Sequence, residues 1–147
     1  AFDISEINGV TGILALTDST NSVAGGDDVS IIDYTNGTAL VPSAVAATGN
    51  VIKVAYSNSI NSYSDISGSS GLQAGSISLD ADLGALDAIA MTYYDADAGK
   101  AIFGMYVNDG TADATIDNAG SFNEIGNASM TITAYNALGA SNFSFLA

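Results

Sequence analysis

The chain has 147 residues, with 16 acidic side chains against two lysines and a formal net charge of −14. It contains no arginine, histidine or cysteine. This charge balance argues against nucleic-acid, phosphate and acidic-membrane partners, because almost nothing in the chain neutralises a phosphate. The absence of cysteine excludes disulfides and thiolate metal sites.

Hydrophobic residues make up 48% of the chain, so its composition is that of a folded protein and not of a disordered acidic tail. The length predicts a single domain over residues 1–147, with enough residues for its own core. No apolar run approaches the length of a membrane span, so we expect no membrane insertion. The many Ser, Asn, Gly and Thr residues, and a start at Ala1 that fits signal-peptide removal, favour an extracellular or cell-surface location.

The N-terminal segment 1–16 is unusually apolar for a chain end. Gly9 and Gly12 disfavour a helix there, so we expect an extended segment with a bend. A free apolar strip of this kind is avoided by soluble monomers. The segment therefore packs either in its own domain or, as an exchanged strand, in the sheet of a neighbouring copy. The residues that we assign to assembly are Phe2, Ile4, Ile7, Val10 and Ile13.

The next part of the chain reads as short strands separated by turns. Val29–Tyr34 is a predicted strand, and Asn36-Gly37 is a strong hairpin signal because both positions tolerate positive φ. Ala39–Val41 is the predicted return strand, and Val51–Tyr56 is the predicted strand after that.

The middle of the chain begins with its longest polar stretch, residues 57–76, which we expect to be a surface loop or an excursion at the sheet edge. Ile77–Leu79 is a predicted short strand that leads into an acidic turn, Asp80–Gly84.

The segment 86–107 is the predicted centre of the fold. Two apolar runs, 88–94 and 101–107, flank the short polar turn 95–100. Both runs are apolar at both alternating positions, whereas a strand with one wet face would alternate apolar and polar residues. We therefore predict two interior strands joined as a hairpin. In the first run, one face carries Ile89, Met91 and Tyr93, and the other carries Ala88, Ala90 and Tyr94.

The C-terminal part contains a predicted short strand at Ala114–Ile116 within a loop-rich stretch, 108–128. Ser129–Tyr135 alternates regularly and is predicted to be a strand, with a return segment at Asn142–Leu146. About nine or ten short strands with intervening turns predict an all-β fold, an antiparallel β-sandwich or jelly roll.

The side chains needed for most catalytic mechanisms are absent. Without His, Cys or Arg there is no catalytic triad, no thiol nucleophile and no arginine clamp. Glu6 and Glu124 are the only glutamates, and neither Lys53 nor Lys100 lies in a Ser-x-x-Lys pattern. A pair of carboxylates for glycoside hydrolysis is the remaining option. We expect the protein not to be an enzyme.

Two segments, Asp80–Gly84 and Asp95–Gly99, match the pattern Asp-x-Asp-x-Gly. Alternate aspartates direct carboxylates to one side, and glycine permits the sharp turn that Ca²⁺ coordination requires. Neither segment continues as an EF-hand, since Met91 and Tyr106 stand where a glutamate ligand would be. The alternative is an ordinary turn between strands. The candidate Ca²⁺ ligands are Asp95, Asp97, Asp80 and Asp82.

The seven tyrosines suggest a second kind of site, an aromatic surface for stacking on a glycan. Most of them lie in or at the ends of predicted strands, so packing in the core is the interpretation that we favour.

These observations lead to two hypotheses of different kinds. The first is a secreted structural subunit that self-assembles into an extracellular filament, sheath or surface layer, motivated by many strand edges and few catalytic residues. The second is a Ca²⁺-dependent carbohydrate-binding or adhesin module, motivated by the acidic turns and the tyrosines. A virus decoration protein would have the same composition.

Overall fold

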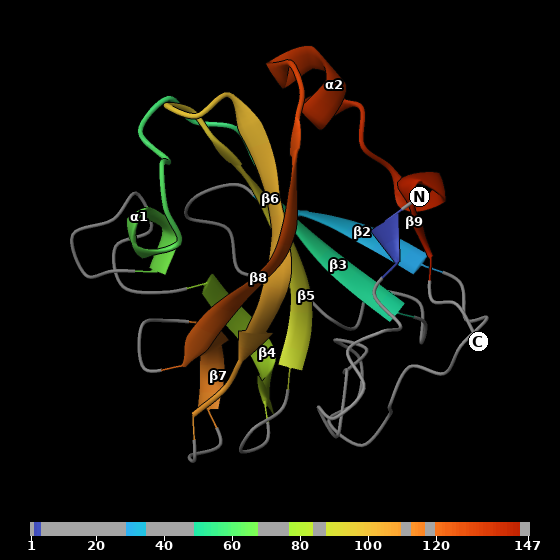
Figure 1. Cartoon of the computed structure of the whole chain (residues 1–147). Coiled ribbons are helices and arrows are strands. Elements are labelled where there is room, and N and C mark those ends of the chain that lie inside the picture. Colours follow the sequence, from blue (N-terminus) through green and yellow to red (C-terminus); the bar gives the residue numbers. More distant parts are fainter. Residues whose placement is uncertain are drawn as a thin grey trace.

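A five-stranded sheet forms the centre of the molecule (Figure 1). The computed structural model describes residues 2–3, 29–34, 49–67, 77–83, 88–109, 113–116 and 120–144. The strand order is β2-β3-β5-β6-β8. The bounds of these strands are Val29–Tyr34 for β2, Gly49–Val54 for β3, Ala88–Asp95 for β5, Lys100–Val107 for β6 and Ser121–Ser129 for β8.

Two short strand pairs and three helical turns complete the described part. β1 (Phe2–Asp3) pairs in parallel with β9 (Phe143–Ser144), and β4 (Ile77–Leu83) pairs antiparallel with β7 (Asp113–Ile116). The helical elements are α1 (Ser64–Ser67), α2 (Ile132–Asn136) and the 3₁₀ turn η2 (Ala140–Asn142). In the ranges that the structure describes, no helix has the length and apolar character needed to cross a membrane.

The described part is mainly β-strand with few helices, as the all-β prediction requires. The expectation of an entirely antiparallel arrangement is wrong, because β2–β3 and β3–β5 are parallel pairs. Parallel neighbours need long crossover connections, and the intervals 35–48 and 55–87 provide them. The predicted Asn36-Gly37 turn and the strand Ala39–Val41 lie outside the described residues.

The predicted central hairpin is confirmed. β5 and β6 are paired antiparallel from Ala88↔Val107 to Asp95↔Lys100. Gly99, at φ +65°, adopts the left-handed conformation that closes the turn. Every residue of β5 from Ala88 to Tyr94 is buried, so both faces of this strand are covered, as its two-sided apolar pattern predicts.

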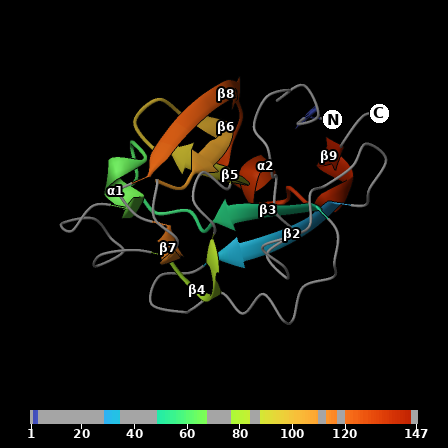
Figure 2. The same ribbon diagram turned by 90° about the horizontal axis from the view of Figure 1, so that it is seen from below.

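The sheet has a separate apolar core on each face, named here after the helix that contributes to it. Figure 2 shows α1 and α2 on opposite sides of the sheet. The α1 face carries Tyr34, Ile52, Val54, Ile60, Ile66, Ile89, Met91, Tyr93, Ile102 and Tyr106. The α2 face carries Val51, Ala88, Ala90, Tyr94, Ala101, Phe103, Met105, Tyr135 and Phe143. The predicted division of the first run between the two faces is therefore confirmed.

The segment that covers part of the α1 face belongs to the polar stretch predicted to be a surface loop. Ile60 and Ile66 are buried against the sheet, at 2% and 0% exposure. The Ala96 N–H donates to the Ile60 carbonyl (2.9 Å), which ties this segment to the β5–β6 turn. Residues 57–63 form turns, as the loop prediction requires, whereas Ser64–Ser67 form the short helix α1. The segment is nevertheless anchored to the sheet, because two apolar residues in a polar sequence are enough to hold it there.

The predicted strand Ser129–Tyr135 is also wrong. β8 ends at Ser129, and α2 begins after Thr131, whose side chain accepts a hydrogen bond from the Ala134 N–H (3.2 Å). This bond is the usual N-cap interaction of a helix. In the resulting helix only Tyr135 is buried, while Ile132 is 37% exposed.

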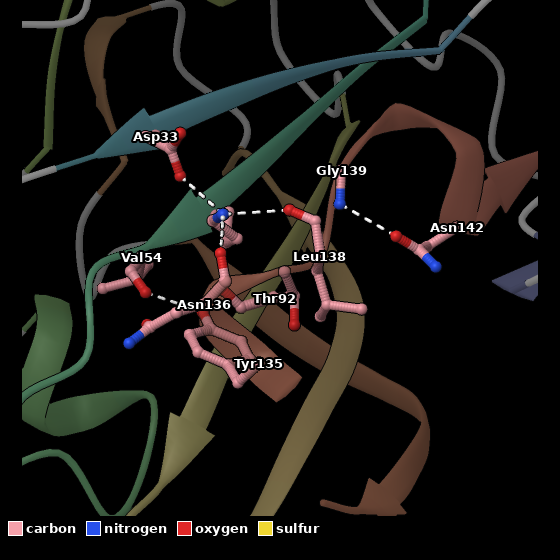
Figure 3. A network of polar contacts seen from close by, with 9 residues as sticks. Asp33, Val54, Thr92, Tyr135, Asn136, Leu138, Gly139 and Asn142 are labelled. Carbon is pink, nitrogen blue, oxygen red and sulfur yellow. Dashed lines mark hydrogen bonds and ion pairs between the residues drawn. The ribbon is translucent and has the colours of Figure 1, made fainter. Parts of the chain in front are cut away.

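Lys53 attaches the end of α2 to the sheet. Figure 3 labels its three partners, Asp33, Asn136 and Leu138. The Lys53 side chain is 9% exposed, and its ammonium group lies 2.9 Å from an Asp33 carboxylate oxygen on the neighbouring strand. It also donates to the carbonyls of Asn136 (3.3 Å) and Leu138 (3.0 Å). The three donors of the ammonium thus meet three acceptors, two of them carbonyls at a helix C-terminus, where positive charge is favourable.

The Tyr135 hydroxyl lies where two parallel strands part. The β3–β5 register ends at Lys53↔Thr92. Beyond that point the hydroxyl donates to the carbonyls of Val54 (2.6 Å) and Thr92 (3.1 Å), one on each strand. Burial is the main cause that raises the pKa of Tyr135 above its usual value, so the hydroxyl keeps its proton and remains a donor.

We expect Tyr135→Phe to lower the free energy of unfolding by about 1–3 kcal/mol, the cost of leaving buried acceptors unsatisfied. Urea denaturation followed by circular dichroism measures this change. The control is Tyr56→Phe, whose ring is partly buried and packs edge-on against Tyr94, with an expected change within about 0.5 kcal/mol. Equal losses in the two variants would contradict the role of the Tyr135 hydroxyl.

Candidate functional site

β8 forms one end of the five-stranded sheet and is the strongest candidate for a functional surface. It pairs with β6 on one side, and in the described part of the chain no strand pairs with its other side. Six of its nine residues are exposed, and none of the nine is buried. An unpaired strand edge presents N–H and C=O groups that another strand can use. The sequence of β8 contains no lysine or proline to block such pairing, and its one charge is Glu124.

A β-bulge divides β8 at Ile125. In the register with β6, Gly104 is opposite Glu124 and Phe103 is opposite Gly126, so Ile125 has no partner of its own. Its side chain is 43% exposed. A bulge adds one residue to a strand and therefore shifts the alternation of the side chains that follow it.

The consequences of this shift are visible on both faces of the sheet. Before the bulge, Phe122 is opposite Tyr106 and packs against the core of the α1 face. After it, Ala128 is opposite Ala101 and packs against the core of the α2 face. Both residue numbers are even, so an unbroken strand would have placed these two side chains on one face.

A polar pair spans the bulge on the solvent side. The Asn127 side-chain amide donates to a Glu124 carboxylate oxygen at 2.7 Å, and both side chains are exposed. By their register with Gly104 and Ile102, both residues belong to the α1 face. The edge therefore carries one acceptor and one donor, placed on the two sides of Ile125.

Aromatic packing holds this edge on the sheet. The Phe122 ring stacks on Tyr63, with centroids 5.1 Å apart and an angle of 12° between the planes, and lies 5.7 Å from Tyr93. Burial is the main cause that raises the pKa of Tyr93 to about 12, and the nearby charges of Glu124 and Asp95 add to it. The Tyr93 hydroxyl is therefore protonated at ordinary pH.

Gly104 leaves the space that Phe122 occupies. A Cβ at this position would overlap the Phe122 ring and the Asn123 carbonyl oxygen. Because Gly104 has no side chain, the Phe122 ring of the edge strand can lie across β6.

The acidic turn 95–99 holds two of the predicted Ca²⁺ ligands, Asp95 and Asp97. An Asp95 carboxylate oxygen accepts the Ala98 N–H (2.8 Å), and the Asp97 N–H donates to the Asn61 side-chain oxygen (3.2 Å). The first is the interaction of an ordinary aspartate turn, and the second joins the turn to the segment that contains Asn61. Among the residues that the structure describes, no three acidic side chains come together in a group that could hold a metal ion.

The other predicted site residues are divided between the described and undescribed parts of the chain. Asp80 and Asp82 lie within β4, so the acidic segment begins as a strand and not as the predicted turn. Their segment contains a register irregularity against β7, between Ser78 and Leu83. Of the predicted assembly residues, Phe2 lies in β1, whereas Ile4, Ile7, Val10 and Ile13 lie outside the described residues.

The tyrosines mainly pack in the two cores. Five of the seven are buried, namely Tyr34, Tyr93, Tyr94, Tyr106 and Tyr135. Tyr56 and Tyr63 are partly buried and contact other aromatic rings. This arrangement agrees with the packing interpretation of the tyrosines.

Sequence reasoning missed β8 altogether and assigned its residues to a loop. The segment Ser121–Ser129 has few apolar residues, and the bulge at Ile125 interrupts any alternation. The one usable signal was the aromatic residue Phe122, followed by polar residues of moderate strand propensity.

The comparisons with known proteins give no relatives. No protein-family model matches this sequence, and neither a curated protein nor a solved structure matches it.

We expect Gly104→Ala to destabilise the protein by about 1–3 kcal/mol, because the added methyl group must displace Phe122 or the β8 backbone. Thermal and urea denaturation measure the loss. Gly139→Ala is the matched control, since a Cβ at Gly139 meets no atom within 4 Å. If both variants are equally stable, Phe122 does not lie across Gly104 in solution.

Proposed function

We propose that this protein is a secreted structural subunit that self-assembles into an extracellular filament, sheath or surface layer and has no enzymatic activity. The observation that carries this proposal is the outer edge of β8, on which the described part of the chain places no strand. β8 is a nine-residue strand at the end of a sheet whose central strands are already buried. Such an edge is a site where another chain adds a strand through main-chain hydrogen bonds.

The composition supports the same proposal. The chain has no histidine, cysteine or arginine, so the side chains of most nucleophilic and acid–base mechanisms are missing. A net charge of −14 keeps separate subunits soluble and opposes their association until salt or cations screen it. Secretion into a salty medium would provide that screening.

The proposed subunit is a β-sandwich in which the five-stranded sheet forms one layer. In the polymer, the N-terminal segment 1–16 of one copy completes the sheet of the next. The alternate apolar residues of that segment, from Phe2 to Ile13, would fill pockets as a donated strand. Repeated head to tail without closure, this contact produces a filament.

Deletion of residues 1–13 is expected to abolish polymer growth while leaving a folded, soluble subunit. Negative-stain microscopy of the full-length and truncated proteins at equal salt tests this, with circular dichroism to confirm folding. A synthetic peptide of residues 1–16 should stop growth of the full-length protein, and a scrambled peptide should not. Normal filaments from the truncated protein would refute strand exchange, whereas failure of the full-length protein to form any polymer would refute the function.

A Ca²⁺-dependent carbohydrate-binding or adhesin module is the second candidate, favoured by the placement of Asp95 and Asp97 in one glycine-closed turn. It predicts that CaCl₂ raises the melting temperature more than NaCl at equal ionic strength, and that EDTA reverses the gain. The expected stabilisation is about 2.7 kcal/mol at a hundredfold excess over Kd. Asp97→Asn is expected to remove the effect. Identical melting curves in the two salts would eliminate this candidate.

A further inference from the structure

We propose that β8 docks antiparallel on β8 of a second copy, about a two-fold axis that passes between Ile125 and Gly126. This specifies one contact of the proposed assembly and rests on that proposed function. The bulge restricts the register of this pairing, and the side chains of β8 select one register from those allowed.

The bulge limits how two β8 strands can pair. Residues directly opposite each other in an antiparallel pair have their side chains on the same face. Phe122 and Glu124 belong to the α1 face before the bulge, and Asn127 and Ser129 belong to it after the bulge, by their register with β6. The residues between them, apart from the bulge, belong to the α2 face.

A symmetric pairing that uses the whole strand must therefore match residues before the bulge with residues after it. Only two positions of the axis do so. One lies between Glu124 and Ile125, and the other lies between Ile125 and Gly126. An axis through Ile125 itself would place Asn123 opposite Asn127 of the second copy, and these belong to different faces.

Side-chain chemistry selects the axis between Ile125 and Gly126. Glu124 is then opposite Asn127 of the second copy, so the amide and carboxylate that already bond within one chain at 2.7 Å can bond between chains, twice. Ile125, which is 43% exposed, lies opposite a glycine that leaves room for it. The other axis would place the Glu124 carboxylate opposite the apolar side chain of Ile125.

The symmetry of this contact defines its place in the assembly. The same strand is used on both copies, so the contact closes as a dimer with one continuous sheet and does not propagate. A filament would need a second contact that does not use the β8 edge, such as exchange of residues 1–16 at another edge of the neighbouring copy. Each copy carries a charge of −14, so the dimer should form only when salt screens the repulsion; the Debye length falls from about 30 Å at 0.01 M to about 3 Å at 1 M.

Disulfide trapping tests the register directly, because the chain has no cysteine of its own. The variant Asn123→Cys/Ala128→Cys places its thiols opposite each other across the two-fold axis, with an expected Cα separation of about 5 Å. Within one extended strand these positions are about 16 Å apart, too far for a disulfide. We expect most of this variant to become a covalent dimer on mild oxidation in 1 M NaCl, as seen on a non-reducing gel.

The matched control is Asn123→Cys/Asn127→Cys, the pair that an axis through Ile125 would join, which should stay monomeric. Sedimentation of the unmodified protein in 0.01 M and 1 M NaCl gives a readout that needs no mutation, with dimers expected at the higher salt. Cross-linking of the control pair, or a monomer in 1 M NaCl, would overturn the inference. Covalent dimers without filaments would refute the proposed polymer but support the β8–β8 contact. Filaments without 123–128 cross-links would support the polymer but refute the β8–β8 contact.

Discussion

The burial of both faces of the β5–β6 hairpin is the constraint on which the rest of the structure depends. Each of the residues from Ala88 to Tyr94, and from Ala101 to Tyr106, is buried. A strand pair that is apolar on two sides must be covered on two sides. The segment 55–67 contributes to one cover, and the C-terminal segment with α2 and Phe143 contributes to the other. The sheet is thus covered on both faces, while the described residues place no strand along the outer edge of β8.

Polar groups inside these layers are paired in ways that also fix the positions of the covering segments. The Thr92 hydroxyl donates to the Ile102 carbonyl at 2.8 Å within the sheet. Lys53 and Tyr135 join the sheet to the α2 segment in opposite directions: the lysine donates to carbonyls of that segment, and the tyrosine donates to carbonyls of the strands. Buried polar groups are costly unless satisfied, so these bonds favour one placement of the segment over alternatives of similar apolar contact.

The elements that could be predicted from the sequence are those whose own burial determines their pattern of apolar residues. The central hairpin, β2 and the short strand β7 were found because a run of apolar residues is a local property. The parallel order β2-β3-β5 was not found, since it depends on the path of long connections that the local pattern does not encode. Ser129–Tyr135 was wrongly predicted to be a strand because its residues alternate. The Thr131 N-cap favours a short helix instead, and in that helix Tyr135 is the one buried residue.

The candidate site was harder to predict for a related reason. An edge strand has one neighbour and half-exposed faces, so β8 needs few apolar residues and shows little periodicity. Its bulge at Ile125 further conceals the alternation, because the residues before and after it follow opposite phases. The acidic turns were conspicuous in the sequence. In the turn 95–99, however, the Asp95 carboxylate stabilises the turn itself by accepting the Ala98 N–H.

Bulges commonly protect a sheet edge by interrupting its ladder of hydrogen bonds, so the bulge in β8 raises the question of how such an edge accepts a partner. A straight partner strand meets an irregular edge and loses register at Ile125. A second β8 carries the same irregularity, and about a two-fold axis at the bulge the two irregularities coincide. In the proposed β8–β8 dimer, the bulge that blocks unrelated strands would therefore admit the one strand that has the same bulge. Selectivity of this kind comes from excluding wrong partners as much as from contacts with the right one. The proposed self-assembling subunit would have to stay soluble until it meets another copy, and an edge with a single carboxylate on a chain of net charge −14 is consistent with that requirement.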